Sequence, residues 1–161
     1  MLKRINLGVG AIGASGDLQA MLFTTLGSCV AVVAIDPYDR IAGLVHVALP
    51  DSSISPEKAG SCPGYFADTG IPLLLREMAR LRGRAPGRLL IKLVGGARVL
   101  DPASTFDIGK RNVLAVKKIL WEYRLGVLAE DTGGAMSRTV KVSVATGRVA
   151  VSYQGEERLI L

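Results

Sequence analysis

The chain reads VAVVAIDPYDRIAGLVHVALP over residues 30–50, so two apolar runs flank a short polar segment. Short runs rich in valine, isoleucine and alanine, bounded by turn residues, are typical of buried β-strands. The segment Asp36–Arg40, which contains Pro37, has the composition of a turn. The stretch therefore predicts two neighbouring buried strands joined by a turn, with Cys29 just before the first strand and His46 inside the second.

Similar apolar runs elsewhere in the chain predict further strands. They cover residues 2–9, 21–25 and 89–94. Residues 140–144 alternate between apolar and polar side chains, the pattern of a strand with one buried face. Thr146-Gly147 separates that segment from residues 148–153, which indicates a β-hairpin.

Two segments have the spacing of amphipathic helices. Their apolar stripes consist of Ile71, Leu74, Leu75, Met78 and Leu81 in the first, and of Val113, Val116, Leu120 and Tyr123 in the second. Asn112 lies at the start of the second segment, where asparagine commonly caps a helix. Many strands and two helices without regular alternation predict an α/β or α+β fold built in layers.

Length and composition restrict the class of protein. A chain of 161 residues, of which 49% are hydrophobic and 21% charged, has the size and composition of one globular domain spanning residues 1–161. We find neither a run of eighteen apolar residues nor the apolar segment of a signal peptide, so no membrane insertion is expected. Two cysteines in an unsecreted chain indicate reduced thiols, and we expect a cytoplasmic protein.

The net charge of +6 has two interpretations. Five arginines lie around one predicted helix end: Arg76, Arg80, Arg82, Arg84 and Arg88. Cations at a helix C-terminus favour the helix dipole, so a solvated helix end is the preferred interpretation, with a docking surface for an acidic partner as the alternative. Basic residues are not interleaved with aromatic ones, so nucleic acid is not an expected partner.

Cys29 and His46, the single histidine, are the candidate catalytic pair. A thiol becomes a useful nucleophile when a nearby base favours its thiolate, which predicts covalent catalysis on a carbonyl group. Gly27 and Ser28 precede the thiol and would leave backbone N–H groups free to bind an oxyanion. The alternative is that both residues are ordinary core side chains. One histidine and two distant cysteines do not form a zinc site, so no metal is expected.

The relative position of the pair is an open question at this stage. Counting around the turn at residues 36–40 predicts that Cys29 and His46 fall toward opposite ends of the two strands. An offset pairing, or a third strand between them, would then be needed to bring them together. Thr24 is a candidate hydroxyl for orienting the imidazole, because such a base is usually held by a third group.

At these residues the chain resembles the CheD family of bacterial and archaeal chemotaxis proteins. Six stretches carry the resemblance in order: LGSCVAV (26–32), GLVHVALPDS (43–52), YFADT (65–69), KLVGGA (92–97), IGKRNV (108–113) and AEDTGG (129–134). The resemblance extends over nearly the whole chain. It implies layered mixed β-sheets with flanking helices, a fold similar to that of toxin-type cysteine deamidases.

The resemblance also implies an activity and its residues. CheD proteins are amidohydrolases that convert chemoreceptor glutamine side chains to glutamate and release ammonia, without a metal or organic cofactor. The family's nucleophile corresponds to Cys29, its histidine to His46 and its catalytic threonine to Thr24, with Thr25 as the neighbouring alternative. Gly95 and Gly96, like Gly27 and Ser28, are expected near the substrate, because paired glycines allow a backbone to approach closely.

The implied partners are methyl-accepting chemoreceptors and a CheC-type phosphatase, which binds CheD and adjusts its activity. Two alternatives to the deamidase remain open. One is a non-catalytic adaptor that docks on receptors or on a phosphatase, and the other is a cysteine amidase or peptidase with a different substrate.

Overall fold

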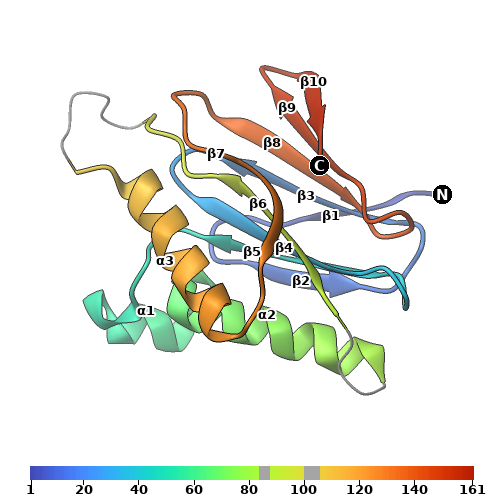
Figure 1. The fold of residues 1–161 in the computed structure, drawn as a ribbon, viewed down its shortest axis with the longest axis horizontal. Helices are drawn as coiled ribbons and strands as arrows, with labels where there is room; N and C mark the ends of the chain where they lie inside the picture. Colours follow the sequence, from blue (N-terminus) through green and yellow to red (C-terminus); the bar gives the residue numbers. More distant parts are fainter. Residues whose placement is uncertain (84–87, 100–105) are drawn as a thin grey trace.

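Two mixed β-sheets form the body of the molecule (Figure 1). The computed structural model describes residues 1–83, 88–99 and 106–161. In the first sheet the strand order is β1 (Lys3–Asn6), β3 (Ala20–Leu26), β8 (Arg138–Ser143), β9 (Val149–Tyr153), β10 (Glu156–Ile160). In the second it is β2 (Ile12–Ser15), β5 (Ile41–Val47), β4 (Val30–Asp36), β6 (Leu90–Gly95), β7 (Val127–Thr132). The pairs β1–β3 and β6–β7 are parallel, and the other ladders are antiparallel.

Alternation along the strands produces two separate apolar layers. Leu22 of β3, Val33 of β4 and Val140 of β8 point into the layer between the two sheets. The opposite face of β4, with Val30 and Val32, packs against the helices. Because β4 and β5 are covered on both faces, all their residues are buried, as expected for strands that read as continuous apolar runs.

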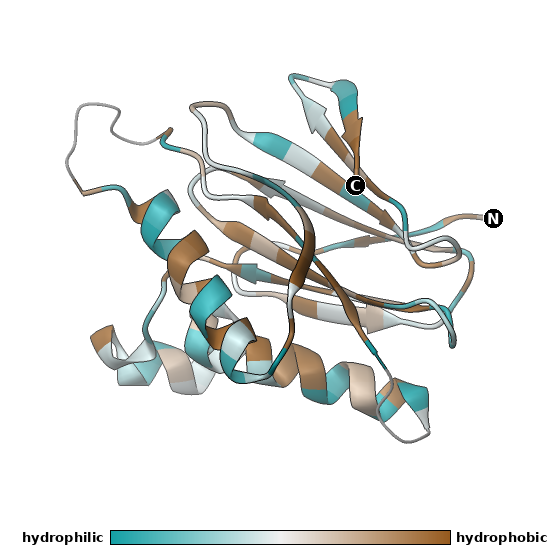
Figure 2. Cartoon of the chain, in the orientation of Figure 1, coloured by the Kyte–Doolittle hydropathy of each residue, from teal (hydrophilic) through white to brown (hydrophobic). Residues whose placement is uncertain are grey.

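Two long helices cover the outer face of the second sheet. They are α2 (Ala67–Arg82) and α3 (Ile108–Glu122), and their brown apolar stripes turn toward the sheet in Figure 2. The polar segment before α2 contains η1 (Ser52–Ile54), α1 (Pro56–Ser61) and η2 (Pro63–Tyr65). The layered α/β arrangement with flanking helices confirms the predicted fold class. No helix within the described part of the chain is long and apolar enough to cross a membrane.

The register of β4 and β5 corrects the prediction that Cys29 and His46 lie at opposite ends. Val30 pairs with Val47 and Ala31 pairs with His46, without an intervening strand or an offset. An antiparallel hairpin folds back symmetrically about its turn, so residues at similar distances from the turn come to the same end. Cys29 and His46 are at such similar distances, and the prediction of opposite ends is wrong.

The arginines of the predicted basic cluster have different environments. Arg80 pairs with Glu77 along α2, and Arg82 forms a buried ion pair with Asp36 at the end of β4. Arg76 and Arg88 are exposed, whereas Arg84 lies outside the described residues. Two of the five arginines that would form a docking surface for an acidic partner are therefore already paired with carboxylates of this chain.

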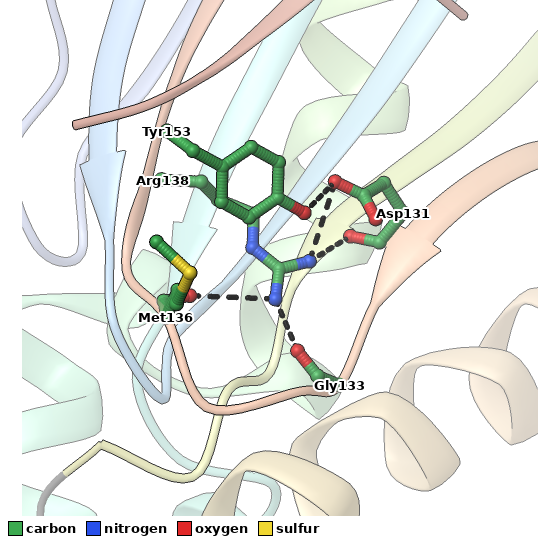
Figure 3. Close-up of polar contacts among 5 residues, drawn as sticks. All are labelled: Asp131, Gly133, Met136, Arg138 and Tyr153. Carbon is green, nitrogen blue, oxygen red and sulfur yellow. Dashed lines mark hydrogen bonds and ion pairs between the residues drawn. The ribbon is translucent and has the colours of Figure 1, made fainter. Parts of the chain in front are cut away.

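A buried arginine joins the two sheets near the start of β8 (Figure 3). The Arg138 side chain donates to the backbone oxygens of Asp131 (2.6 Å), Gly133 and Met136 (3.5 Å), and pairs with the Asp131 carboxylate at 3.5 Å. Tyr153 donates its hydroxyl hydrogen to the same carboxylate. The cluster therefore ties β7 of one sheet to β8 and β9 of the other and shapes the connection between β7 and β8.

Replacing Arg138 by methionine is expected to lower the free energy of unfolding by about 3 kcal/mol. Only 3% of Arg138 is exposed, and its removal would leave a partly buried carboxylate and three carbonyl oxygens without their donor. Urea denaturation followed by circular dichroism measures the change. Arg158→Met is the control, because Arg158 is exposed and pairs with exposed Glu156. Equal stability of the two variants would show that the cluster contributes no such energy.

Candidate active site

The centre of the site is a hydrogen-bonded chain that crosses from one sheet to the other. Thr24 points from β3 into the layer between the sheets, and His46 points into the same layer from β5. The Thr24 hydroxyl oxygen lies 2.7 Å from His46 Nδ1 and donates to the backbone oxygen of Leu7 at 2.6 Å. His46 Nδ1 also lies 3.4 Å from that carbonyl oxygen. Thr24 is 5% and His46 2% exposed, so this chain is shielded from water.

These contacts determine which nitrogen of His46 carries the proton. The Leu7 carbonyl can only accept, and the single hydroxyl hydrogen of Thr24 is used toward it. If Nδ1 carried no hydrogen, Nδ1 and Thr24 Oγ1 would be two acceptors in contact with no hydrogen between them. With a hydrogen on Nδ1, the ring can donate to Thr24 Oγ1. The proton is therefore assigned to Nδ1, and Nε2 presents its lone pair. Nε2 is buried and has no hydrogen-bond partner among the described residues.

Cys29 immediately precedes β4, on the face of the sheet that carries the His46 imidazole. It packs with Ala31 against the apolar layer between the sheets, and Ala31 is directly opposite His46. Residues two apart on a strand point to the same face, so the thiol and the imidazole are diagonal neighbours on one face. Such neighbours are roughly 7–8 Å apart, within reach of a long side chain. Cys29 as a whole residue is half-buried.

Burial favours the uncharged form of both groups of the pair. It raises the pKa of the Cys29 thiol above its ordinary value. It also lowers the pKa of His46, an effect that the Leu7 carbonyl opposes by hydrogen bonding to the ring. The sequence argument expects a depressed thiol pKa, and the structure gives the opposite direction, because burial raises the pKa of the thiol and no charge of the described residues offsets it.

The predicted glycines contact the Cys29 segment through its backbone. Gly96 donates its N–H to the Cys29 carbonyl at 2.8 Å, and Ala97 donates to the Gly27 carbonyl at 3.0 Å. Gly95 has φ +118°, and a Cβ there would lie 2.2 Å from the Cys29 carbonyl oxygen. Only glycine therefore allows β6 to approach the thiol segment this closely. Among the described residues, the N–H groups of Ser28 and Cys29 have no hydrogen-bond acceptor.

The structure distinguishes Thr24 from Thr25. Thr25 points to the exposed face of β3, where its hydroxyl lies 3.3 Å from that of Thr139. Thr24 shares the buried face with Leu22 and Leu26. That alternation of burial is not visible in the sequence, because Met21 and Phe23 on the other face of β3 are apolar too. The Leu7 carbonyl had no sequence signal either, because any residue supplies such an oxygen.

The Arg138 cluster borders this same end of the molecule. Gly133, whose carbonyl accepts from Arg138, donates its N–H to the Gly95 carbonyl at 2.9 Å. Gly134 accepts from the Arg98 N–H at 2.8 Å. The connection between β7 and β8 therefore packs on the backbone that holds Cys29. No group of three histidine, cysteine or acidic side chains suitable for a metal ion occurs in the described residues.

Comparison with known proteins assigns the class of this fold and site. The family model for CheD, described as chemotactic sensory transduction, matches residues 48–153. The "probable chemoreceptor glutamine deamidase CheD" of Syntrophotalea carbinolica is 54% identical over 151 residues, covering 92% of this chain and 93% of the relative. The chain belongs to the CheD family.

More distant relatives cover the chain equally well. The "probable chemoreceptor glutamine deamidase CheD 2" of Anaeromyxobacter dehalogenans is 45% identical over 93% of this chain and 94% of its own length. The "chemoreceptor glutamine deamidase CheD" of Thermotoga maritima is 37% identical over 96% of this chain and 94% of its own length. The family model starts after Thr24, Cys29 and His46. The alignments with these two relatives cover 93% and 96% of the chain, so the uncovered ends are too short to contain these three residues.

Proposed function

We propose that this protein is a cytoplasmic chemoreceptor glutamine deamidase that hydrolyses the side-chain amide of receptor glutamines by Cys–His covalent catalysis. The observation that carries the proposal is the buried His46, whose Nδ1–H is held by Thr24 and whose free Nε2 shares a face with Cys29. The names of the CheD relatives supply the substrate, a chemoreceptor glutamine. Both cysteines are unpaired, as expected in a reducing compartment.

In the proposed first step, Cys29 attacks the carbonyl carbon of the glutamine side chain. His46 Nε2 accepts the thiol proton as the carbon–sulfur bond forms, and the carbonyl electrons move to oxygen. In this proposal the N–H groups of Ser28 and Cys29, which have no acceptor among the described residues, donate to that oxyanion. The resulting imidazolium is stabilised by the Thr24 oxygen and the Leu7 carbonyl, which both accept from Nδ1–H.

In the second step the carbon–nitrogen bond breaks. The imidazolium returns its proton to the departing nitrogen, so ammonia leaves and a thioester remains on Cys29. His46 then removes a proton from a water molecule that attacks the thioester. Carbon–sulfur cleavage yields glutamate, and the proton returns to the sulfur. Acid–base help of this kind typically contributes roughly a hundred- to ten-thousand-fold in rate.

The resting enzyme holds a neutral thiol beside a neutral imidazole. Burial raises the pKa of Cys29 and lowers that of His46, so burial favours the uncharged form of both groups. The proton is therefore transferred as the substrate reacts, and a preformed thiolate–imidazolium pair is not required.

Isotopically labelled water provides the test of this function. The wild-type protein, incubated with a purified chemoreceptor, should release ammonia and place one labelled oxygen in each converted glutamine, as read by peptide mass spectrometry. Free glutamine is the control substrate. Receptor binding without conversion would favour the adaptor, and conversion of free glutamine or unrelated peptides alone would favour another amidase. A CheC-type phosphatase stays a predicted second partner, to be tested by whether it changes this rate.

A further inference from the structure

Asn112 is a buried polar side chain in α3 that the proposed chemistry does not use. Asp107 caps this helix by accepting from the Lys110 N–H, so Asn112 lies inside the helix and is not its cap. It is 0% exposed. Its Nδ2 donates to the Ser28 carbonyl at 3.1 Å and to the Ala48 carbonyl at 2.9 Å.

The two carbonyl oxygens determine the orientation of this amide. Both partners can only accept, so the NH2 group must face them, and a flipped amide would place Oδ1 against two oxygens. Oδ1 is itself buried and has no partner among the described residues. A buried acceptor without a donor is costly, so the side chain is kept here for its two donated hydrogen bonds.

Both bonded carbonyls belong to the backbone that carries the proposed pair. Ser28 immediately precedes Cys29, and Ala48 follows His46 by two residues along the extension of β5. Since Val30 pairs with Val47, the next positions outward are Cys29 and Ala48. Asn112 therefore bridges the two neighbouring backbone segments at the point where the ladder of β4 and β5 ends, next to Cys29 in the sequence.

We propose that Asn112 is a positioning residue that fixes the Cys29 segment relative to the strand of His46, an inference that rests on the proposed function. No other hydrogen bond among the described residues joins Ser28 to the segment after β5, so loss of the bridge would let the Cys29 segment move relative to the strand of His46. A displacement of about 1 Å at a reacting group is enough to cost roughly a hundred-fold in rate.

The test compares Asn112→Leu with Val116→Ala in a Cys62→Ser background, where Cys29 is the single thiol. Val116 lies one turn further along α3, is fully buried in the apolar core and hydrogen-bonds to neither carbonyl. Its substitution therefore controls for a loss of helix packing alone. Asn112→Leu should lower kcat for receptor deamidation roughly a hundred-fold with little change in KM. Val116→Ala should keep kcat near that of the background protein.

Alkylation of Cys29 by iodoacetamide gives a second readout that needs no deamidase activity. His46→Ala should slow this reaction several-fold near pH 7 by removing the acceptor of the thiol proton, and Asn112→Leu should slow it to a similar extent. The proposal would be overturned if Asn112→Leu had the same deamidation rate and the same alkylation rate as Val116→Ala. Asn112→Ser replaces the leucine variant if the latter does not fold. Failure of both to fold, with Val116→Ala folded, would show a purely structural role.

The two inferences fail separately. If the wild-type protein converts no receptor glutamine, the proposed function is wrong, yet the alkylation rates still show whether Asn112 positions the thiol against the imidazole. If the wild type is active and Asn112→Leu equals its control, the positioning role alone is wrong.

Discussion

Alanine in place of Cys29 is expected to abolish receptor deamidation, with a loss of roughly ten-thousand-fold or more. Removing the nucleophile of a covalent mechanism leaves only binding and oxyanion contacts to assist the reaction. The carbon–sulfur bond cannot form, so neither ammonia nor labelled glutamate should appear in the mass-spectrometric assay. The half-buried position of the sulfur means that the smaller side chain should fit without rearranging the strand.

Cys62→Ala is the matched control for this variant. Cys62 is also half-buried and unpaired, but its sulfur lies 3.7 Å from the Gly10 carbonyl and, within the described residues, has no hydrogen bond to Cys29 or His46. Full activity is expected after its substitution. Conversion at the wild-type rate by Cys29→Ala would eliminate the proposed nucleophile, and a loss of activity in Cys62→Ala alone would transfer that role.

His46→Ala is expected to lower kcat/KM for deamidation by roughly a hundred- to ten-thousand-fold, the range of acid–base catalysis. It should also remove a limb of the pH profile. Burial lowers the pKa of His46, so in the wild type the base becomes available as the pH rises through a value below about 6.5, and activity should increase there. The variant has no such group and should lack that increase.

The variants Thr24→Val and Thr24→Ser test whether the Thr24 oxygen supports the His46 imidazole. Valine preserves the shape but removes the oxygen that accepts from Nδ1–H, so an intermediate loss is expected. Serine retains that oxygen and should restore most of the activity. An unfolded His46→Ala variant, together with full activity of Thr24→Val, would mean that His46 is an ordinary core residue.

Elements with one consistent burial pattern could be predicted from sequence. The runs at β4 and β5 are apolar because both faces are covered, and α2 has a regular apolar stripe. The edge strand β10 is exposed at every residue, and β7 mixes half-buried and exposed positions. β10 therefore has no burial pattern to read, whereas β7 alternates between half-buried and exposed positions although its sequence, VLAEDT, does not alternate between apolar and polar residues.

The site was predictable to the extent that it follows from one hairpin. A symmetric register about the turn at residues 36–40 brings Cys29 and His46 to one end, and that register could have been counted correctly. The Thr24–His46 contact could not be counted, because it depends on how one sheet stacks on the other. The same holds for the two bonds of Asn112, which join a helix to chain segments 64 and 84 residues away.

The division of the site between two sheets links catalysis to tertiary order. Thr24 and the Leu7 carbonyl belong to the first sheet or its extension, whereas His46 and Cys29 belong to the second. A state that retains every strand but lets the sheets slide would keep its secondary structure and lose the proton assignment of the imidazole. Deamidase activity would then be lost before the far-ultraviolet circular dichroism signal of the strands. Activity would therefore report on the packing of the two sheets against each other.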